Sequence, residues 1–202
     1  MPTNASFQEQ TIASFQDQIA STKPKSIAKL RPNTTFKGYQ RTGKFEYDMT
    51  ATIQTVDLDQ SYACGYLVTK GMTTVNPVIK SFFEVEIIGR EYSFETKKWD
   101  TTFESDREHW NRLPGFKNEY LNGEYDILKD SHIFMRWNER FLVPNHKQVL
   151  LNATLDGFYY LSMSKQTGEI AGFHYLKTAS EWFQPVLLKY QFPKSFSSFE
   201  FR

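Results

Sequence analysis

The chain has 202 residues, with 24 Lys or Arg against 23 Asp or Glu, so the formal net charge is +1. This balance gives no broad basic field for nucleic acid, and the single cysteine, Cys64, excludes an internal disulfide. No signal peptide is visible, and no apolar stretch approaches the roughly 20 residues needed to span a bilayer. We therefore expect one domain in the cytosol or nucleus, with no integral membrane association.

Residues 1–33 differ in composition from the rest of the chain, because they are rich in Gln, Ser, Thr and Ala. Such a composition is typical of a flexible segment. Ile12, Phe15 and Ile19 also fall at helical spacing, which fits a short amphipathic helix that docks on a partner. The sequence leaves both interpretations open.

From residue 34 onward the pattern is typical of β-structure, with one predicted helix at 105–113. Ser105 and Glu108 match a capping box there, and Pro114 ends the helix. A short turn is predicted at 180–182. Eight strands joined mainly by short turns predict an antiparallel barrel or sandwich. Period-two alternation places these strands at 45–54, 62–69, 79–88, 92–96, 133–143, 155–164, 169–177 and 186–192.

One carboxylate stands out in the strand that begins at Ile133. Alternate residues of a strand share a face, so Glu139 falls in a row with Ile133, Met135 and Trp137. A lone buried charge costs several kcal/mol unless something pairs with it. Either an internal Lys or Arg pairs with Glu139, or the cation arrives with a ligand.

Motifs for catalysis are absent from the sequence. It contains no glycine-rich phosphate loop, no nucleophile elbow and no metal-ligand spacing. Cys64 lies within a strand pattern, which is more typical of a small core residue than of a nucleophile. We therefore expect a binding protein without metal or cofactor. Two alternatives are an enzyme that uses Cys64 or His174 and a lipocalin-like carrier of a small apolar molecule.

Nine short segments carry a resemblance to a known family. They are FKGYQ at 36–40, CGYL at 64–67, FFEVEII at 82–88, KWD at 98–100, HW at 109–110, FMRWNERFLVP at 134–144, GFYY at 157–160, SEWFQ at 180–184 and FEFR at 199–202. In order and spacing they resemble the substrate receptors of the glucose-induced-degradation (GID) ubiquitin ligase, called the CTLH complex in animals. This family is also named for vacuolar import and degradation.

The resemblance implies a fold and a function. The fold is an eight-stranded antiparallel, lipocalin-like β-barrel with short helical insertions and a pocket at one end. The pocket would bind the first residues of proteins that begin with proline (a Pro/N-degron) or with another small or apolar residue. The receptor would present these proteins for ubiquitylation and proteasomal degradation and would do no chemistry itself.

The resemblance also implies the pocket residues. Glu139 would bind the ligand's N-terminal ammonium, the Tyr159 hydroxyl would contact the terminus, and the Gln40 amide would bond the ligand backbone. Leu142 matches a leucine of the pocket rim, although alternation places it opposite Glu139 unless regular strand geometry ends between them. Five further positions depart from the leucine, leucine, serine, phenylalanine and tyrosine usual in the family: Met72, Ile79, Thr154, Leu155 and His174. These changes affect which ligand residues the pocket prefers.

The last residues form a candidate anchor, which we place at 196–202 of a barrel domain spanning 34–202. Chain ends usually fray, but two aromatic residues and an arginine in four positions are typical of a docking segment. The resemblance implies that Phe199, Phe201 and Arg202 insert into an armadillo-repeat scaffold subunit of the ligase.

Overall fold

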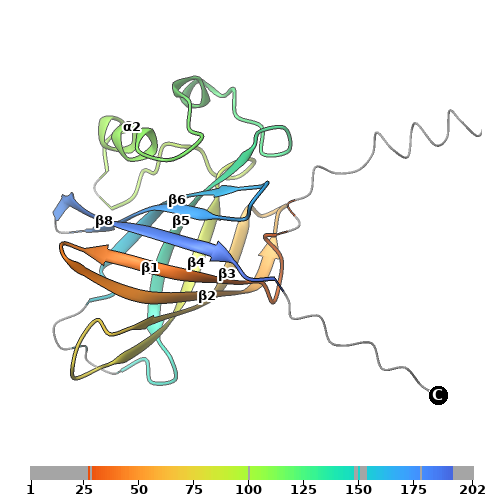
Figure 1. Cartoon of the computed structure of the whole chain (residues 1–202). Coiled ribbons are helices and arrows are strands. Elements are labelled where there is room, and N and C mark those ends of the chain that lie inside the picture. The colour runs from red at the N-terminus through yellow and green to blue at the C-terminus, as the bar shows by residue number, and fades with distance from the viewer. Residues whose placement is uncertain are drawn as a thin grey trace, which may run out of the picture.

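The computed structural model describes residues 27, 29–99, 101–147, 150, 154–177 and 179–192, without the side chains of 179–181. The expected anchor at 196–202 and residues 1–26 lie outside the described residues. Eight strands form one closed barrel in chain order, each antiparallel to the next, and β8 returns to pair with β1 (Figure 1). The strands are β1 (Thr35–Thr42), β2 (Phe45–Asp57), β3 (Tyr62–Lys70), β4 (Val78–Ile87), β5 (His132–Leu142), β6 (Gly157–Ser164), β7 (Ile170–Leu176) and β8 (Ala179–Tyr190).

The predicted eight-stranded antiparallel barrel is confirmed, but two of its elements were placed wrongly. Residues 92–96 form no strand, because their only ladder contact is a single bridge between Ile88 and Tyr92. The missing strand is β1, whose polar sequence TFKGYQRT hides its alternation. The turn predicted at 180–182 is also wrong, since β8 begins at Ala179 and includes these residues.

Closure of the barrel depends on a glycine in β1. A Cβ atom added at Gly38 would lie 1.9 Å from the carbonyl oxygen of Leu187 on β8. Any side chain there would push the two strands apart. Gly38 therefore permits the close approach through which the first and last strands seal the sheet.

The barrel interior is filled by the inward row of each strand. Phe83, Val85 and Ile87 are fully buried on β4, while the intervening Glu84 and Glu86 face outward, as alternation predicts. Leu30, which precedes β1, packs into the same core and is only 3% exposed. This packing closes the end of the barrel at which the described chain begins and ends.

A second aromatic core lies outside the barrel. The segment between β4 and β5 contains α2 (Phe103–Asn111) and the 3-10 helix η1 (Asn118–Asn122) and covers the outer face of β5 and β6 (Figure 1). Trp110 of α2 packs there against Phe134 and Tyr160. The helix begins earlier than predicted, because its capping box joins Thr102 to Ser105 rather than Ser105 to Glu108.

Buried polar groups attach this segment to the barrel wall. The Asp106 carboxylate accepts the Thr96 amide at 2.7 Å and the hydroxyls of Thr96 and Tyr160. Arg136 donates through Nε to Glu86 at 2.8 Å and through a terminal nitrogen to the Ser93 carbonyl at 3.0 Å. These bonds satisfy charges that would be costly to bury alone.

The two ends of the described chain lie at the closed end of the barrel, where the Gln191 amide donates to the Thr35 carbonyl at 2.9 Å. The opposite end carries the turns after β1, β3, β5 and β7 and forms the mouth. No helix among the described residues is long and apolar enough to cross a membrane.

Candidate functional site: a pocket at the barrel mouth

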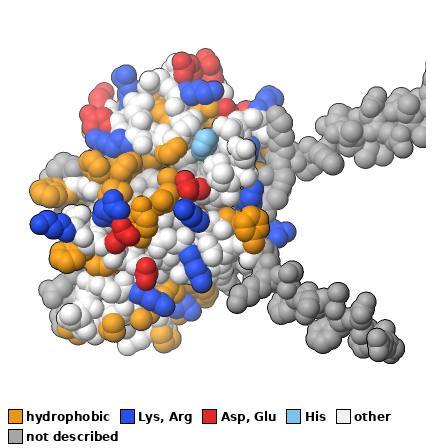
Figure 2. Space-filling model, viewed as in Figure 1, with side chains coloured by type: hydrophobic (Ala, Val, Ile, Leu, Met, Phe, Trp, Pro, Cys, Tyr) orange, Lys and Arg blue, Asp and Glu red, His pale blue; other side chains and the backbone are white. Residues whose placement is uncertain are grey.

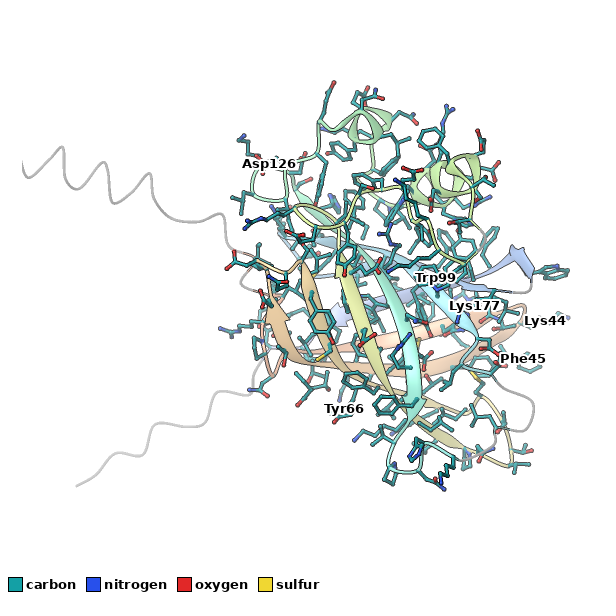
Figure 3. All side chains as sticks on the ribbon, turned by 180° about the vertical axis from the view of Figure 1, so that it is seen from behind. Lys44, Phe45, Tyr66, Trp99, Asp126 and Lys177 are labelled. Atoms are coloured by element: carbon teal, nitrogen blue, oxygen red, sulfur yellow. The ribbon has the colours of Figure 1, made fainter. Side chains whose placement is uncertain are left out.

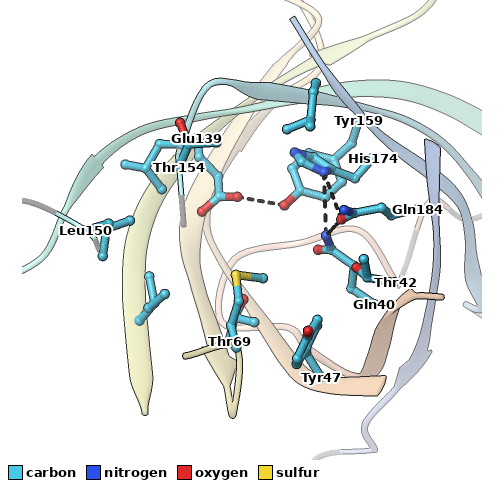
Figure 4. A pocket seen from close by; sticks show the side chains of 14 residues that line it. Gln40, Thr42, Tyr47, Thr69, Glu139, Leu150, Thr154, Tyr159, His174 and Gln184 are labelled. Carbon is cyan, nitrogen blue, oxygen red and sulfur yellow. Dashed lines mark hydrogen bonds between the residues drawn. The ribbon is translucent and has the colours of Figure 1, made fainter. Parts of the chain in front are cut away.

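A cavity of about 240 Å³ opens at the mouth of the barrel (Figure 4). Each of the eight strands contributes at least one residue to its wall. The structure brings together all but one of the pocket residues expected from the sequence. Those lining the cavity are Gln40, Met72, Ile79, Glu139, Thr154, Leu155, Tyr159 and His174.

Leu142, the remaining expected residue, lies in an adjoining hollow. Leu150, Thr154 and Leu155 line both this hollow and the main cavity. A β-bulge at Arg140 makes this possible, because Phe83 pairs with Glu139 whereas Phe82 pairs with Phe141. The extra residue reverses the alternation, so Leu142 is 6% exposed and Phe141 is 44% exposed. Regular strand geometry thus ends between Glu139 and Leu142.

Among the described residues, the Glu139 carboxylate is held by hydroxyl groups and by no cation. Tyr159 donates to Oε1 at 2.6 Å, and Ser81 donates to Oε2. Among the residues that the structure describes, no Lys, Arg or His forms an ion pair with Glu139. The internal partner considered from the sequence is therefore not found in this part of the chain.

Burial governs the protonation of this pair. Desolvation raises the pKa of Glu139 above its ordinary 4.5, and the hydrogen bonds from Ser81 and Tyr159 offset only part of the rise. Desolvation, together with the nearby carboxylate, also raises the pKa of the Tyr159 phenol well above 10.0. Tyr159 is thus the proton donor, and Glu139 is a carboxylate that a cation would stabilise.

The wall opposite Glu139 carries two amides and an imidazole. Gln40 donates to Gln184, and His174 Nδ1 lies 3.4 Å from the Gln184 oxygen and 3.5 Å from the Gln40 nitrogen. Figure 4 shows Glu139 on one side of the cavity and these amides on the other, with Tyr159 and His174 between them. The pocket therefore offers a charged acceptor at one wall and neutral hydrogen-bonding groups at the other.

His174 is a neutral, tightly packed residue. Burial lowers its pKa from 6.5 to about 4, although the contact with Gln184 acts in the opposite direction. Its ring lies 4.5 Å from the Tyr159 ring, centroid to centroid. A Cβ atom added at Gly157 would lie 1.8 Å from its Nε2. Glycine at position 157 thus provides the space that the imidazole occupies.

Comparison with known proteins shows the family. The family described as Vacuolar import and degradation protein matches residues 29–191. The chain belongs to this family. The resemblance found in the sequence is therefore confirmed.

Named relatives of this family match most of the chain. The Glucose-induced degradation protein 4 homolog of Mus musculus is 38% identical over 175 residues, covering 83% of this chain and 80% of the mouse protein. The GID complex substrate-recognition subunit 4 of Schizosaccharomyces pombe is 33% identical, covering 69% of this chain and 80% of that protein. Its namesake in Saccharomyces cerevisiae is 28% identical, and the match covers 82% of this chain but 64% of the yeast protein.

Sequence reasoning missed Gln184, which lines the pocket, and Ser81, which donates to the pocket carboxylate. Ser81 lies on the inward row of β4 beside Phe83, so a polar residue in an apolar row was the available signal. Gln184 lies two residues before the inward Val186 on β8, but the turn predicted at 180–182 obscured this alternation. Five further lining residues were not predicted: Thr42, Tyr47, Thr69, Leu150 and Leu176.

The groups considered for catalysis are not brought together in this structure. Cys64 alternates with the buried Ala63 and Gly65, so its side chain lies on the outside of β3, whereas His174 faces the cavity. Within the described residues, no three His, Cys, Asp or Glu side chains gather where they could hold a metal ion.

Proposed function

We propose that this protein is the substrate-recognition subunit of a GID-type ubiquitin ligase and binds the free N-terminus of proteins that begin with proline. The relatives named as GID complex substrate-recognition subunits support the receptor role. The observation that carries the ligand assignment is Glu139, a carboxylate in a small pocket without a cationic partner among the described residues.

A ligand's N-terminal ammonium supplies the missing charge. A free α-amino group has a pKa of about 7.7–8.0, and a neighbouring carboxylate raises it further. Both groups are then charged at neutral pH. Pairing also offsets the desolvation that raises the pKa of Glu139. Acetylating the terminus removes the ammonium charge and leaves the carboxylate unpaired.

The arrangement of acceptors favours proline. A protonated N-terminal proline is a secondary amine with two N–H donors, whereas other residues present three. Glu139 accepts one of these, and the oxygen of the Tyr159 hydroxyl, which donates to the carboxylate at 2.6 Å and can still accept, takes the second. A pocket with two acceptors thus leaves no donor of proline unsatisfied.

The size of the pocket limits the ligand to a small terminus. Its volume of about 240 Å³ lies below the roughly 300–1,000 Å³ of sites for drug-sized molecules. Met72, Ile79 and Leu155 supply apolar walls. These features suit proline or another small apolar residue. A carrier of apolar molecules would leave Glu139 without a partner, so the pocket does not favour that alternative.

The receptor would act by presentation rather than by catalysis. Phe199, Phe201 and Arg202 would anchor it in an armadillo-repeat scaffold subunit, while the bound N-terminus places the target protein within reach of the ligase. The described chain leaves the barrel at its closed end, away from the mouth, so we propose that the anchor docks from that end. Docking and ligand binding would therefore use opposite ends.

Calorimetric titration with a Pro-Gly-Gly-Gly peptide and its N-acetylated twin tests this function. Removing one partner of a buried charge pair costs about 2–5 kcal/mol, so micromolar binding of the free peptide should fall below detection after acetylation. The Glu139→Gln protein should bind neither peptide, and its matched control, the exposed Glu124→Gln, should keep both results. Equal binding of the two peptides would refute the proposal.

A further inference from the structure

Among the described aromatic side chains exposed at the mouth of the barrel, Phe45 and Trp182 are the most exposed. Phe45 is 68% exposed and Trp182 is 71% exposed. Each lies on a strand that contributes a residue to the cavity wall. Phe45 lies two residues before Tyr47 on β2, and Trp182 lies two residues before Gln184 on β8. Alternation therefore places Phe45 on the pocket side of β2.

The strand register places these two residues at neighbouring parts of the rim. Phe45 pairs with Thr42 of β1, and Gln40 of β1 pairs with Val186 of β8, so β1 separates them by one strand. Figure 3 shows Phe45 with Lys44 at the tip of the β1–β2 hairpin. In Figure 2, hydrophobic side chains gather at the left-hand end, where this hairpin and the start of β8 lie.

Trp182 lies where the pairing between β7 and β8 becomes irregular. The pairing of β7 with β8 is regular to Tyr175 and Phe183, but the next pair joins Leu176 to Ala179. Residues 180–182 thus form a bulge at the mouth. Bulges beside binding sites redirect a side chain and are specific features of a fold rather than defects.

A peptide bound at Glu139 must leave the pocket through this mouth, because Leu30 and the core close the other end. In the ring of eight strands β1 lies across from β5, which carries Glu139. The amides of Gln40 and Gln184 lie on that far wall, where they can bond the peptide backbone. A peptide that extends from Glu139 toward them then meets Phe45 and Trp182.

The distance from Glu139 on β5 to the aromatic pair determines which ligand residue reaches Phe45 and Trp182. From β5 to β8 there are three strand spacings of about 4.8 Å each, an arc of about 14 Å. An extended peptide advances about 3.4 Å per residue, so it covers this arc in about four residues.

We propose that Phe45 and Trp182 form a second binding site, for an apolar side chain at about the fourth residue of the ligand. The inference rests on the proposed function and adds to it a preference beyond the first residue. The two aromatic rings, exposed in the free protein, are covered when such a side chain packs between the hairpin and the β8 bulge.

Calorimetric titration with a series of hexapeptides provides the test. Each peptide begins Pro-Gly, with leucine at the third, fourth or fifth position and glycine elsewhere, and an all-glycine continuation is the reference. The ratio of affinities, leucine peptide to reference, is measured for the wild type, Phe45→Ala, Trp182→Ala and the double variant. Phe192→Ala is the matched control, because Phe192 is 80% exposed at the closed end.

We expect one leucine position to raise affinity about tenfold or more in the wild type, since burying a leucine side chain is favourable by at least this factor. The ratio should fall in each single variant, approach one in the double variant and stay unchanged in Phe192→Ala. Using ratios within each protein isolates the coupling from general effects of the substitution.

Other outcomes overturn the inference in distinguishable ways. If the reference peptide binds but no leucine position improves affinity, the second site is absent and the proposed function stands. If leucine helps equally in the wild type and the double variant, the apolar side chain binds elsewhere. If no peptide binds, including the reference, the proposed function fails and the second site fails with it.

Discussion

Replacing Glu139 with glutamine should stabilise the ligand-free protein at neutral pH while removing its affinity for N-termini. The raised pKa means that the folded state holds the carboxyl proton more tightly than the unfolded chain does. Ionisation therefore costs folding free energy, about 1.4 kcal/mol for each unit of the pKa difference. Glutamine has nearly the same shape and carries no charge, so this cost disappears.

Two hydrogen bonds oppose this gain. Ser81 and Tyr159 donate to the carboxylate, and bonds to a charged group contribute about 1.5–3 kcal/mol each against about 0.5–1.5 kcal/mol for neutral pairs. Desolvation is nevertheless the larger effect, because the pKa is raised despite both bonds. We therefore expect a net gain in the free energy of unfolding. For a chain of this size each kcal/mol gained raises Tm by roughly 2–4 °C.

Thermal unfolding followed by circular dichroism at several pH values measures the effect. The advantage of Glu139→Gln over the wild type should be complete above the raised pKa and should vanish as the pH falls from that value to 4.5. Other titrating groups are common to both proteins and cancel in the difference. The exposed Glu124→Gln should match the wild type throughout. A variant that unfolds at lower temperature at pH 7.5, or a difference that persists on acidification, would refute the reasoning.

Three further predictions concern the wall and the second core. Asp106→Asn should lower the free energy of unfolding in urea by about 2–3 kcal/mol, because its buried carboxylate accepts the Thr96 amide and two hydroxyls. Gly157→Ala should cost about 1–3 kcal/mol in the same assay by displacing the His174 ring, and a second change, His174→Ala, should recover part of the loss. His174 has a pKa of about 4 in the fold against 6.5 in the unfolded chain, so folding stability should fall as the pH drops from 6.5 toward 4. The free energy of unfolding, measured in urea at several pH values, should fall less steeply between pH 6.5 and 4 in His174→Gln than in the wild type. An unchanged slope would count against a buried neutral imidazole.

Alternation alone predicted the position of the central carboxylate. Ile133, Met135 and Trp137 were expected on one face of β5, and all three are buried inside the barrel. A charged residue in such a row is conspicuous without any knowledge of the fold. Residues such as Gln40 and Tyr159, by contrast, carried no signal of their own, and only the family resemblance placed them at the site.

Long-range packing set the limit of the sequence prediction. Alternation places Phe134 and Arg136 on the outer face of β5, yet both are buried, because the segment between β4 and β5 covers that face. The bulge at Arg140 was equally hidden, since strict alternation continues through Phe141 and would place Leu142 outside. Both features depend on partners that a period-two pattern does not contain.

The position of Glu139 between two donor strands explains how a charge can be kept available for a ligand. Ser81 on β4 and Tyr159 on β6 flank β5, so the carboxylate is oriented from both sides by the sheet itself. A lysine or arginine in the same place would stabilise the carboxylate more strongly, but it would occupy the position that an incoming ammonium needs. Hydroxyl donors fix the geometry and leave the charge unneutralised. The pocket is therefore preorganised for a cation at the expense of stability in its absence.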